Sequence, residues 1–198
     1  GLVIDTPVGR IIHTGDFKLD AAHQKQKVLQ RFEAAGKNGA LLLLSDSTNV
    51  EQEGKPRSDA QIKDELFKIC KKAERRIIFS VFATNIHRIE QVLDIAGQLG
   101  KRVFLSGRSV ENNVAIARRL KFINPRKASI IMDLRHLARH RPEKTIEICT
   151  GSQAEFRSAL WRISVNEHSQ VSVRPDDIVI LSSRFIPGNE KEISHLIN

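Results

Sequence analysis

Tyrosine is absent from this chain of 198 residues and tryptophan occurs once, so aromatic residues make up only 5% of it. This scarcity argues against an RNA-binding sheet that stacks bases on exposed aromatic rings. The two cysteines, Cys70 and Cys149, exclude a disulfide framework and are typical of a reducing compartment. The longest apolar run, residues 40–44, is far shorter than the roughly 20 residues of a membrane-spanning helix, and no stretch resembles a signal peptide.

Methionine is equally scarce, since Met132 is the only one. We therefore expect a fragment of a longer protein, because the chain opens with Gly1 instead of an initiator methionine. Residues 1–4 have the apolar character of a strand, and residues 190–198 have the pattern of a helix that stops in mid-course. On this interpretation, any active site is only partly contained in these residues.

Positive charge is what the sequence has in surplus. Lysine and arginine number 32 against 23 aspartates and glutamates, which gives a formal net charge of +9. A composition of 40% hydrophobic and 28% charged residues excludes a disordered tail and a fibrous protein. The surplus favours a polyanionic partner such as nucleic acid. A basic surface that serves solubility alone is the alternative that composition leaves open.

Apolar and amphipathic stretches alternate along the chain, which predicts strands and helices in turn. The expected strands are 2–5, 9–14, 41–44, 77–82, 102–105, 145–149 and 178–181, and the expected helices are 21–35, 58–75, 86–99, 109–120, 154–165 and one from Asn189. This order predicts an α/β fold with a parallel sheet flanked by helices, preceded by a hairpin. The wholly apolar stretch 41–44 is expected to be a buried strand, and a domain boundary is expected near residues 49–56.

Small polar residues follow five of these strands, at 45–49, 83–85, 106–109, 150–153 and 182–183. Ligands bind outside the carboxyl ends of the strands in such sheets, and hydroxyl groups and helix N-termini bind anions. We therefore predict a phosphate-binding edge. Its candidate residues are Thr84, Asn85, His87, Arg88, Arg108, Ser109 and Ser152. Ordinary helix capping is the alternative for any one of these turns.

Three cationic side chains strengthen the anion hypothesis. Arg108 carries a guanidinium that can bind a phosphate with two hydrogen bonds, although a surface ion pair is its alternative role. His87 and Arg88 fall in the first turn of an expected helix, where a cation opposes the helix dipole. An anionic ligand would explain both, and simple solvation is the alternative.

No metal site is evident from residue spacing. Asp16 follows Gly15 just after the expected strand 9–14, where a carboxylate can bind a metal or close an Asx turn, and the residues alone favour the turn. The strings HxHxDH, HExxH and CxxC are absent from the sequence. The strings GxGxxG and GxxxxGK[ST] are absent as well, which argues against a small nucleotide-binding domain.

Six separated strings resemble the ribonuclease J family, a β-CASP group of the metallo-β-lactamase superfamily. They are HTGDFK at 13–18, LSDSTN at 44–49, ATNIHR at 83–88, GRS at 107–109, TGSQ at 150–153 and IPGNE at 186–190. The resemblance runs nearly end to end. It implies that residues 1–50 end the first metallo-β-lactamase segment, that 51–185 form a β-CASP domain, and that 186–198 begin the return to the metallo-β-lactamase domain.

The resemblance also implies roles for single residues. Asp16 would bridge two zinc ions, with manganese as the alternative metal, and Asp46 would be an acidic residue close to the catalytic centre. Thr84 and Asn85 match a Ser-Asn pair that helps to bind RNA phosphate, with threonine in place of serine. Ala154 departs from the family pattern, which has glycine after Gly-Ser-Gln. The HxHxDH motif and the remaining histidine ligands are expected outside these 198 residues.

The function implied by the resemblance is that of a cytoplasmic, metal-dependent ribonuclease. It would cut single-stranded RNA from a 5′-monophosphate end and internally, in RNA processing and decay that includes ribosomal RNA. These residues alone are expected to be inactive, because one carboxylate cannot assemble a dinuclear site. No membrane partner is expected, and homo-oligomer formation stays open. The alternative is a non-catalytic RNA-binding module of the β-CASP type.

Overall fold

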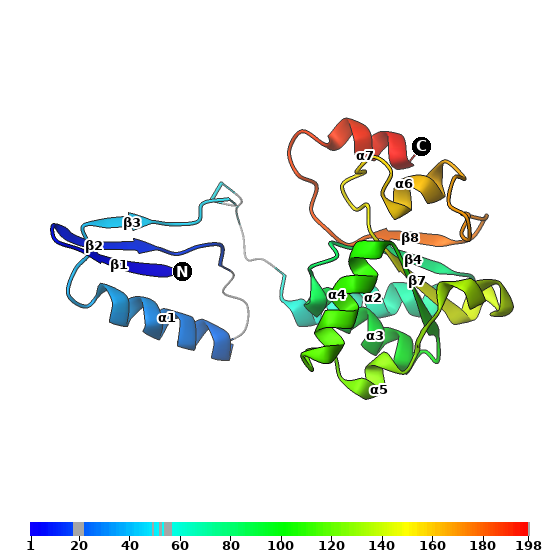
Figure 1. Cartoon of the computed structure of the whole chain (residues 1–198), viewed down its shortest axis with the longest axis horizontal. Helices are drawn as coiled ribbons and strands as arrows, with labels where there is room; N and C mark the ends of the chain where they lie inside the picture. The colour runs from blue at the N-terminus through cyan, green and yellow to red at the C-terminus, as the bar shows by residue number, and fades with distance from the viewer. Residues whose placement is uncertain (18–21, 49, 52, 54–56, 198) are drawn as a thin grey trace. The chain divides into compact units, whose positions relative to one another are not determined.

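The structure is a computed structural model that describes residues 1–17, 22–48, 50, 51, 53 and 57–197 (Figure 1). It divides into two compact units, Gly1–Asp64 and Glu65–Asn198, and this division falls inside the helix α2 (Asp59–Lys72). The boundary expected near residues 49–56 lies largely outside the described residues, as do Lys18 and Asn49, which end two of the motif strings. Within the described ranges, no helix is long and apolar enough to cross a membrane.

The first unit contains a three-stranded sheet and one long helix. Strands β1 (Leu2–Thr6) and β2 (Gly9–His13) form the antiparallel hairpin that their short connector predicts. Strand β3 (Leu42–Leu44) runs parallel to β2, and α1 (Ala22–Gly36) provides the crossover between them. Parallel neighbours need such a crossover, and it brings the carboxyl ends of β2 and β3 to the same edge of the sheet.

The expectation that residues 41–44 form a buried strand is wrong. Leu42, Leu43 and Leu44 are 45%, 59% and 45% exposed. Successive residues of a strand face opposite sides of the sheet, so neither face is fully covered within this unit. A continuous apolar run is typical of strands with a layer on each side, and a single helix against three strands does not supply two layers.

The second unit is built on five parallel strands in the order β6-β5-β7-β4-β8, which confirms the predicted α/β class. They are β4 (Ile77–Ser80), β5 (Arg102–Ser106), β6 (Ile131–Met132), β7 (Thr145–Cys149) and β8 (Ile178–Leu181). Because all pairs are parallel, the carboxyl ends of these strands form one row along a single edge. The row brings together turns that are far apart in the sequence.

Helices pack on both faces of this sheet (Figure 1). Besides α2, they are α3 (Ile86–Gln98), α4 (Arg108–Arg119), α5 (Pro125–Ala128), α6 (Ala159–Ser164) and α7 (Glu190–Ile197), with 3-10 helices η1 (Leu134–Arg139) and η2 (Pro142–Lys144). In α3, buried Ile89, Val92 and Ala96 recur at helical spacing and face the core. Gly100, at φ 62°, follows the end of this helix in the left-handed conformation typical of such ends.

The core of the second unit lies on both sides of the strands. On one side, Ile78 of β4 and Phe104 of β5 pack against Leu160 and Ile163 of α6. The strand register places Glu147 of β7 between Ile78 and Phe104 on this same side. The central strands are therefore enclosed on both faces, which holds the positions of their carboxyl ends.

The helix expected over 154–165 begins later, at Ala159. Ala154 and Arg157 have φ values of 57° and 60°, which are left-handed conformations that an α-helix cannot contain. Ser158 caps the helix instead, and its Oγ accepts a hydrogen bond from the N–H of Trp161 at 3.3 Å. Residues 154–157 therefore form a turn between β7 and α6.

Candidate functional site

In the first unit, Asp16 and Asp46 follow the carboxyl ends of the adjacent parallel strands β2 and β3. Buried Thr14 joins the two strand ends: its N–H donates to the Leu44 carbonyl at 2.9 Å, and its Oγ1 accepts from the Asp46 N–H at 3.0 Å. The motif strings around residues 13–18 and 44–49 thus meet at one edge of this sheet. Two carboxylates that are far apart in the sequence share that edge.

Asp46 is held by its own turn. Its Oδ1 accepts hydrogen bonds from the Thr48 hydroxyl at 2.6 Å and from the Thr48 N–H at 3.0 Å. The Thr48 hydroxyl, followed by the Thr48 N–H, lowers the pKa of Asp46 below its ordinary value, and the N–H of Phe17 acts in the same direction. These donors keep the Asp46 carboxyl ionised and oriented.

Asp16 has the opposite character, because its side chain is exposed and its carboxylate has no hydrogen bond to any described residue. Nearby His13 is also exposed, and its Nδ1 accepts the N–H of Gly15 at 2.9 Å. The described part of the chain contains no cluster of three or more His, Cys, Asp or Glu side chains that could hold a metal ion. A carboxylate without a competing donor suits a cation, so Asp16 fits the role of one ligand in a larger set.

In the second unit, the hydrogen bonds given for the predicted residues after β4 lie within α3 and its N-terminal cap. Asn85 caps α3, with its Oδ1 accepting the N–H of Arg88 at 3.1 Å. His87 and Arg88 both contact Gln91, at 3.1 and 2.7 Å. Thr84 lies directly before them in the same turn. Capping, the alternative left open from the sequence, is the role that the geometry gives Asn85.

The turn after β7 is largely structural. Gln153 donates to the Ser183 hydroxyl at 3.0 Å and to the Arg184 carbonyl at 2.7 Å, and its Oε1 accepts the N–H of Ile186 at 2.9 Å. These three bonds tie the 150–153 turn to the segment that follows β8. Ser152 is only 1% exposed, and its Oγ has no hydrogen-bond partner among the described residues. Its side chain therefore lies inside the turn and not on the open edge.

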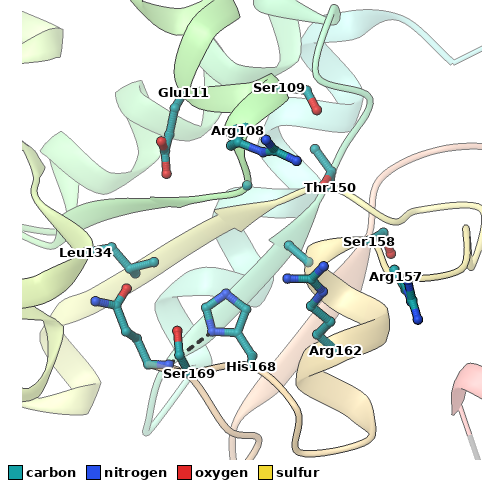
Figure 2. A pocket seen from close by; sticks show the side chains of 13 residues that line it. Arg108, Ser109, Glu111, Leu134, Thr150, Arg157, Ser158, Arg162, His168 and Ser169 are labelled. Atoms are coloured by element: carbon teal, nitrogen blue, oxygen red, sulfur yellow. Dashed lines mark hydrogen bonds between the residues drawn. The ribbon is translucent and has the colours of Figure 1, made fainter.

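A cavity of about 360 Å³ opens between the ends of β5 and β7 (Figure 2). Arg108 and Ser109 are the two predicted phosphate-binding residues that line it, whereas the other five do not. The remaining lining residues come from the two strand ends, α4, the start of η1, the turn before α6, α6 itself and the segment after it, and they are Gly107, Glu111, Leu134, Thr150, Arg157, Ser158, Ala159, Arg162, His168, Ser169 and Gln170.

Two glycines allow the walls of this cavity to approach closely. Gly107 and Gly151 have φ values of 119° and 112°, which other residues rarely adopt. A Cβ on Gly151 would lie 2.3 Å from Ser158 Oγ, and one on Gly107 would lie 3.0 Å from Thr150 Oγ1. The strand-end turns can therefore sit directly against the start of α6 only with glycine at these positions.

His168 anchors the wall opposite α4. Its Nδ1 accepts the N–H of Val171 at 3.1 Å, so the neutral ring carries its proton on Nε2 and donates to Ser106 Oγ at 2.9 Å. Burial lowers the pKa of His168, and the positive charge of Arg162 lowers it further. His168 is therefore a neutral positioning group at pH 7.

Sequence reasoning did not find Arg157, Arg162 or His168. The first two fall within a stretch that was expected to be continuous helix, and His168 follows it without a recognisable motif. The left-handed turn that brings the arginines to the strand ends depends on contacts of Gly151 with residues after the turn. The glycine at 151 was the only local signal available.

Comparison with known proteins shows similarity to one family along the whole chain, so both units are included. The profile of the ribonuclease J beta-CASP domain matches residues 74–198. Proteins named Ribonuclease J from Helicobacter pylori and Thermus thermophilus are 38% and 37% identical to the chain. Ribonuclease J 1 of Streptococcus pyogenes is 41% identical. Each alignment covers 100% of the chain but only 29%, 35% and 35% of the relative, so the chain spans about a third of their length.

Proposed function

This chain belongs to the ribonuclease J family, and from that premise we propose that the protein containing it is a metal-dependent ribonuclease that acts on single-stranded RNA. The proposal includes cleavage from a 5′-monophosphate end and internal cleavage, in RNA processing and decay in the cytoplasm. The observation that carries it is the similarity to proteins named Ribonuclease J along the whole chain, including both carboxylate-bearing strand ends of the first unit.

Asp16 is the residue of this chain that would hold a metal, with zinc or manganese as the ion. Its exposed carboxylate without a hydrogen bond from the described residues fits a ligand for such a cation. When bound, a metal of this kind lowers the pKa of water and polarises a phosphoryl oxygen. Asp46 would keep the neighbouring strand end ordered and negatively charged through its bonds to Thr48.

The second unit would bind the RNA backbone. The chain carries a net charge of +9, and Arg108 and Ser109 line an open cavity at the carboxyl edge of the sheet. Contacts to phosphate depend little on base identity, so this edge would position a strand without reading its sequence. The first unit would then contribute to metal binding, and the second unit would position the RNA strand.

Replacing Arg108 by alanine in the full-length protein should weaken binding of single-stranded RNA about tenfold, because a charge-assisted hydrogen bond to phosphate is lost. The slope of log K against log[salt] should fall by about 0.7 for one phosphate contact. Binding titrations at several salt concentrations measure both. Arg119→Ala, at the other end of α4, is the matched control. An unchanged salt slope in the Arg108 variant would remove this residue from the RNA-binding edge.

A second experiment tests the proposal as a whole. The full-length protein should cleave single-stranded RNA, and a chelator should abolish cleavage. The 198-residue chain alone should not cleave RNA, because its described residues contain no group of three metal ligands. Denaturing gels of a labelled oligoribonucleotide measure both activities. If the full-length protein binds RNA but never cuts it with zinc or manganese, the non-catalytic module is the correct description.

A further inference from the structure

An aromatic pair lies on the surface of the second unit, beside the turn at 154–157. Phe156 is 71% exposed, and its ring meets that of Trp161 edge-on, with centroids 4.8 Å apart. The guanidinium carbon of Arg157 lies 5.2 Å from the Phe156 centroid. Phe156 stays largely exposed despite these two contacts, so it has area left for a further planar group.

The aromatic pair and the cavity are built by the same short stretch of chain. Arg157, Ser158 and Arg162 line the cavity, and Phe156 and Trp161 alternate with them in the sequence. The turn conformation at Ala154 and Arg157 decides this arrangement. Arg157 connects the two, because it lines the cavity and its guanidinium carbon lies against the Phe156 ring.

The cavity itself has the chemistry of a phosphate site. Arg108 enters from α4 and Arg162 from α6 (Figure 2), and neither forms an ion pair or a side-chain hydrogen bond with the residues that the structure describes. Glu111 is the single carboxylate in the lining, against three arginines. Hydroxyl groups of Ser109, Thr150 and Ser158 complete the wall as further hydrogen-bond donors.

No tyrosine, tryptophan or phenylalanine is among the described residues that line this cavity. The guanidinium groups of the three arginines and the neighbouring hydroxyl groups are donors that a phosphate accepts from. Outside, the ring of Phe156 offers a stacking surface but no charge of its own. The cavity thus matches the phosphate of a nucleotide, and the Phe156 ring matches its base.

We propose that Phe156, Trp161 and the arginine-lined cavity form a binding subsite for single-stranded RNA, with a base stacked on Phe156 and the adjoining phosphate held by Arg108 and Arg162. The proposal rests on RNA being the substrate of the full-length protein. Single-strand binding sites combine a basic groove with exposed aromatic rings in this way. A flat apolar protein interface is less well matched, because the charged residues Glu155 and Arg157 flank Phe156 in the sequence and the Arg157 guanidinium lies over its ring.

The test uses the full-length protein with EDTA present, so that RNA is bound and not cut. Fluorescence anisotropy is measured with labelled oligoadenylate of about ten nucleotides, and with a ribose-phosphate oligomer of equal length that carries no bases. Phe156→Ala should weaken oligoadenylate binding roughly five- to hundredfold, the range for loss of one stacked base. It should leave the oligomer without bases unaffected. Phe122→Ala, with a ring 67% exposed beyond the other end of α4, is the matched control.

The cavity is tested with Arg162→Ala against Arg119→Ala. The Arg162 substitution should weaken binding of both oligomers and lower the slope of log K against log[salt] by about 0.7.

Equal oligoadenylate affinity for the Phe156 and Phe122 variants would overturn the subsite. Loss of inorganic phosphate binding in the Arg162 variant, with unchanged oligoadenylate affinity, would assign the cavity to a free anion and overturn it as well. If the unaltered full-length protein binds no RNA, the proposed function and the subsite both fail. If that protein binds and cuts RNA, a negative result for the variants refutes the subsite alone.

Discussion

Replacing Asp16 by asparagine in the full-length protein is expected to lower the rate of RNA cleavage roughly a thousandfold, the equivalent of several kcal/mol of lost metal-based stabilisation. The change removes one negative charge and one carboxylate oxygen from the end of β2 and leaves the shape of the side chain nearly intact. Folding should be unaffected, because the exposed Asp16 carboxylate has no hydrogen bond to the described residues.

Single-turnover cleavage of a labelled oligoribonucleotide, with added zinc or manganese, measures this effect. Bound metal per protein should fall as well, which separates a metal ligand from a residue that only contacts RNA. Glu33→Gln is the matched control, since it makes the same carboxylate-to-amide change at an exposed position on α1 of the same unit. Full activity of the Asp16→Asn protein would show that the similarity to ribonuclease J does not extend to the chemistry of this strand end.

The second large effect concerns Glu147, a fully buried carboxyl group in the middle strand of the second sheet. Burial raises its pKa from 4.5 to about 7, although the positive charge of Arg76 and the Ser106 hydroxyl oppose this shift. Both carboxyl oxygens of Glu147 are buried without a hydrogen-bond partner among the described residues. Burial therefore destabilises the ionised carboxylate more than the neutral acid.

The sign of the pH dependence follows from this shift. Between pH 4.5 and 7 the folded state binds a proton at Glu147 that the unfolded state has released, so the free energy of unfolding falls as pH rises through this window. Glu147→Gln removes that dependence. From about pH 5 to about pH 8, the stability of the variant relative to the unaltered chain should increase by about 2 to 3 kcal/mol.

Urea unfolding of the chain at several pH values across this window checks the prediction. Trp161 is the only tryptophan, so its fluorescence reports on the second unit. The lowered pKa of His168 adds stability as pH rises, but it does so in both proteins and cancels in the difference. For the control Glu74→Gln, at an exposed site, the free energy of unfolding should change with pH in parallel with that of the unaltered chain. Parallel curves for the Glu147 variant would mean that this carboxyl group keeps its ordinary pKa when folded.

Much of the fold could be predicted because its signals are local. The alternation of short apolar strands with amphipathic stretches such as 86–99 determined the class of the second unit. The placement of Asp16 and Asp46 on one edge follows from two strands in a row that a single helix connects. Arg108 could be singled out because a glycine and a strand end stand directly before it.

What depended on contacts between distant residues could not be predicted. The exposure of Leu42–Leu44 is decided by how many layers pack on the sheet, a quantity that no local pattern contains. Ser152 is a small polar residue in a strand-end turn like the others, yet the bonds of Gln153 to the segment after β8 bury it. The cavity joins residues as far apart as Gly107 and Gln170.

By itself, then, the order of residues determined the α/β class, the motif strings and the carboxylates at two strand ends, because periodicity and turn chemistry act over a few positions. Only the tertiary structure decided that α6 begins after a left-handed turn, and that Arg157 of this turn and Arg162 of α6 line one cavity with the end of β5. The reason is steric: the turn exists because a glycine at 151 lets Ser158 and Leu160 pack against it.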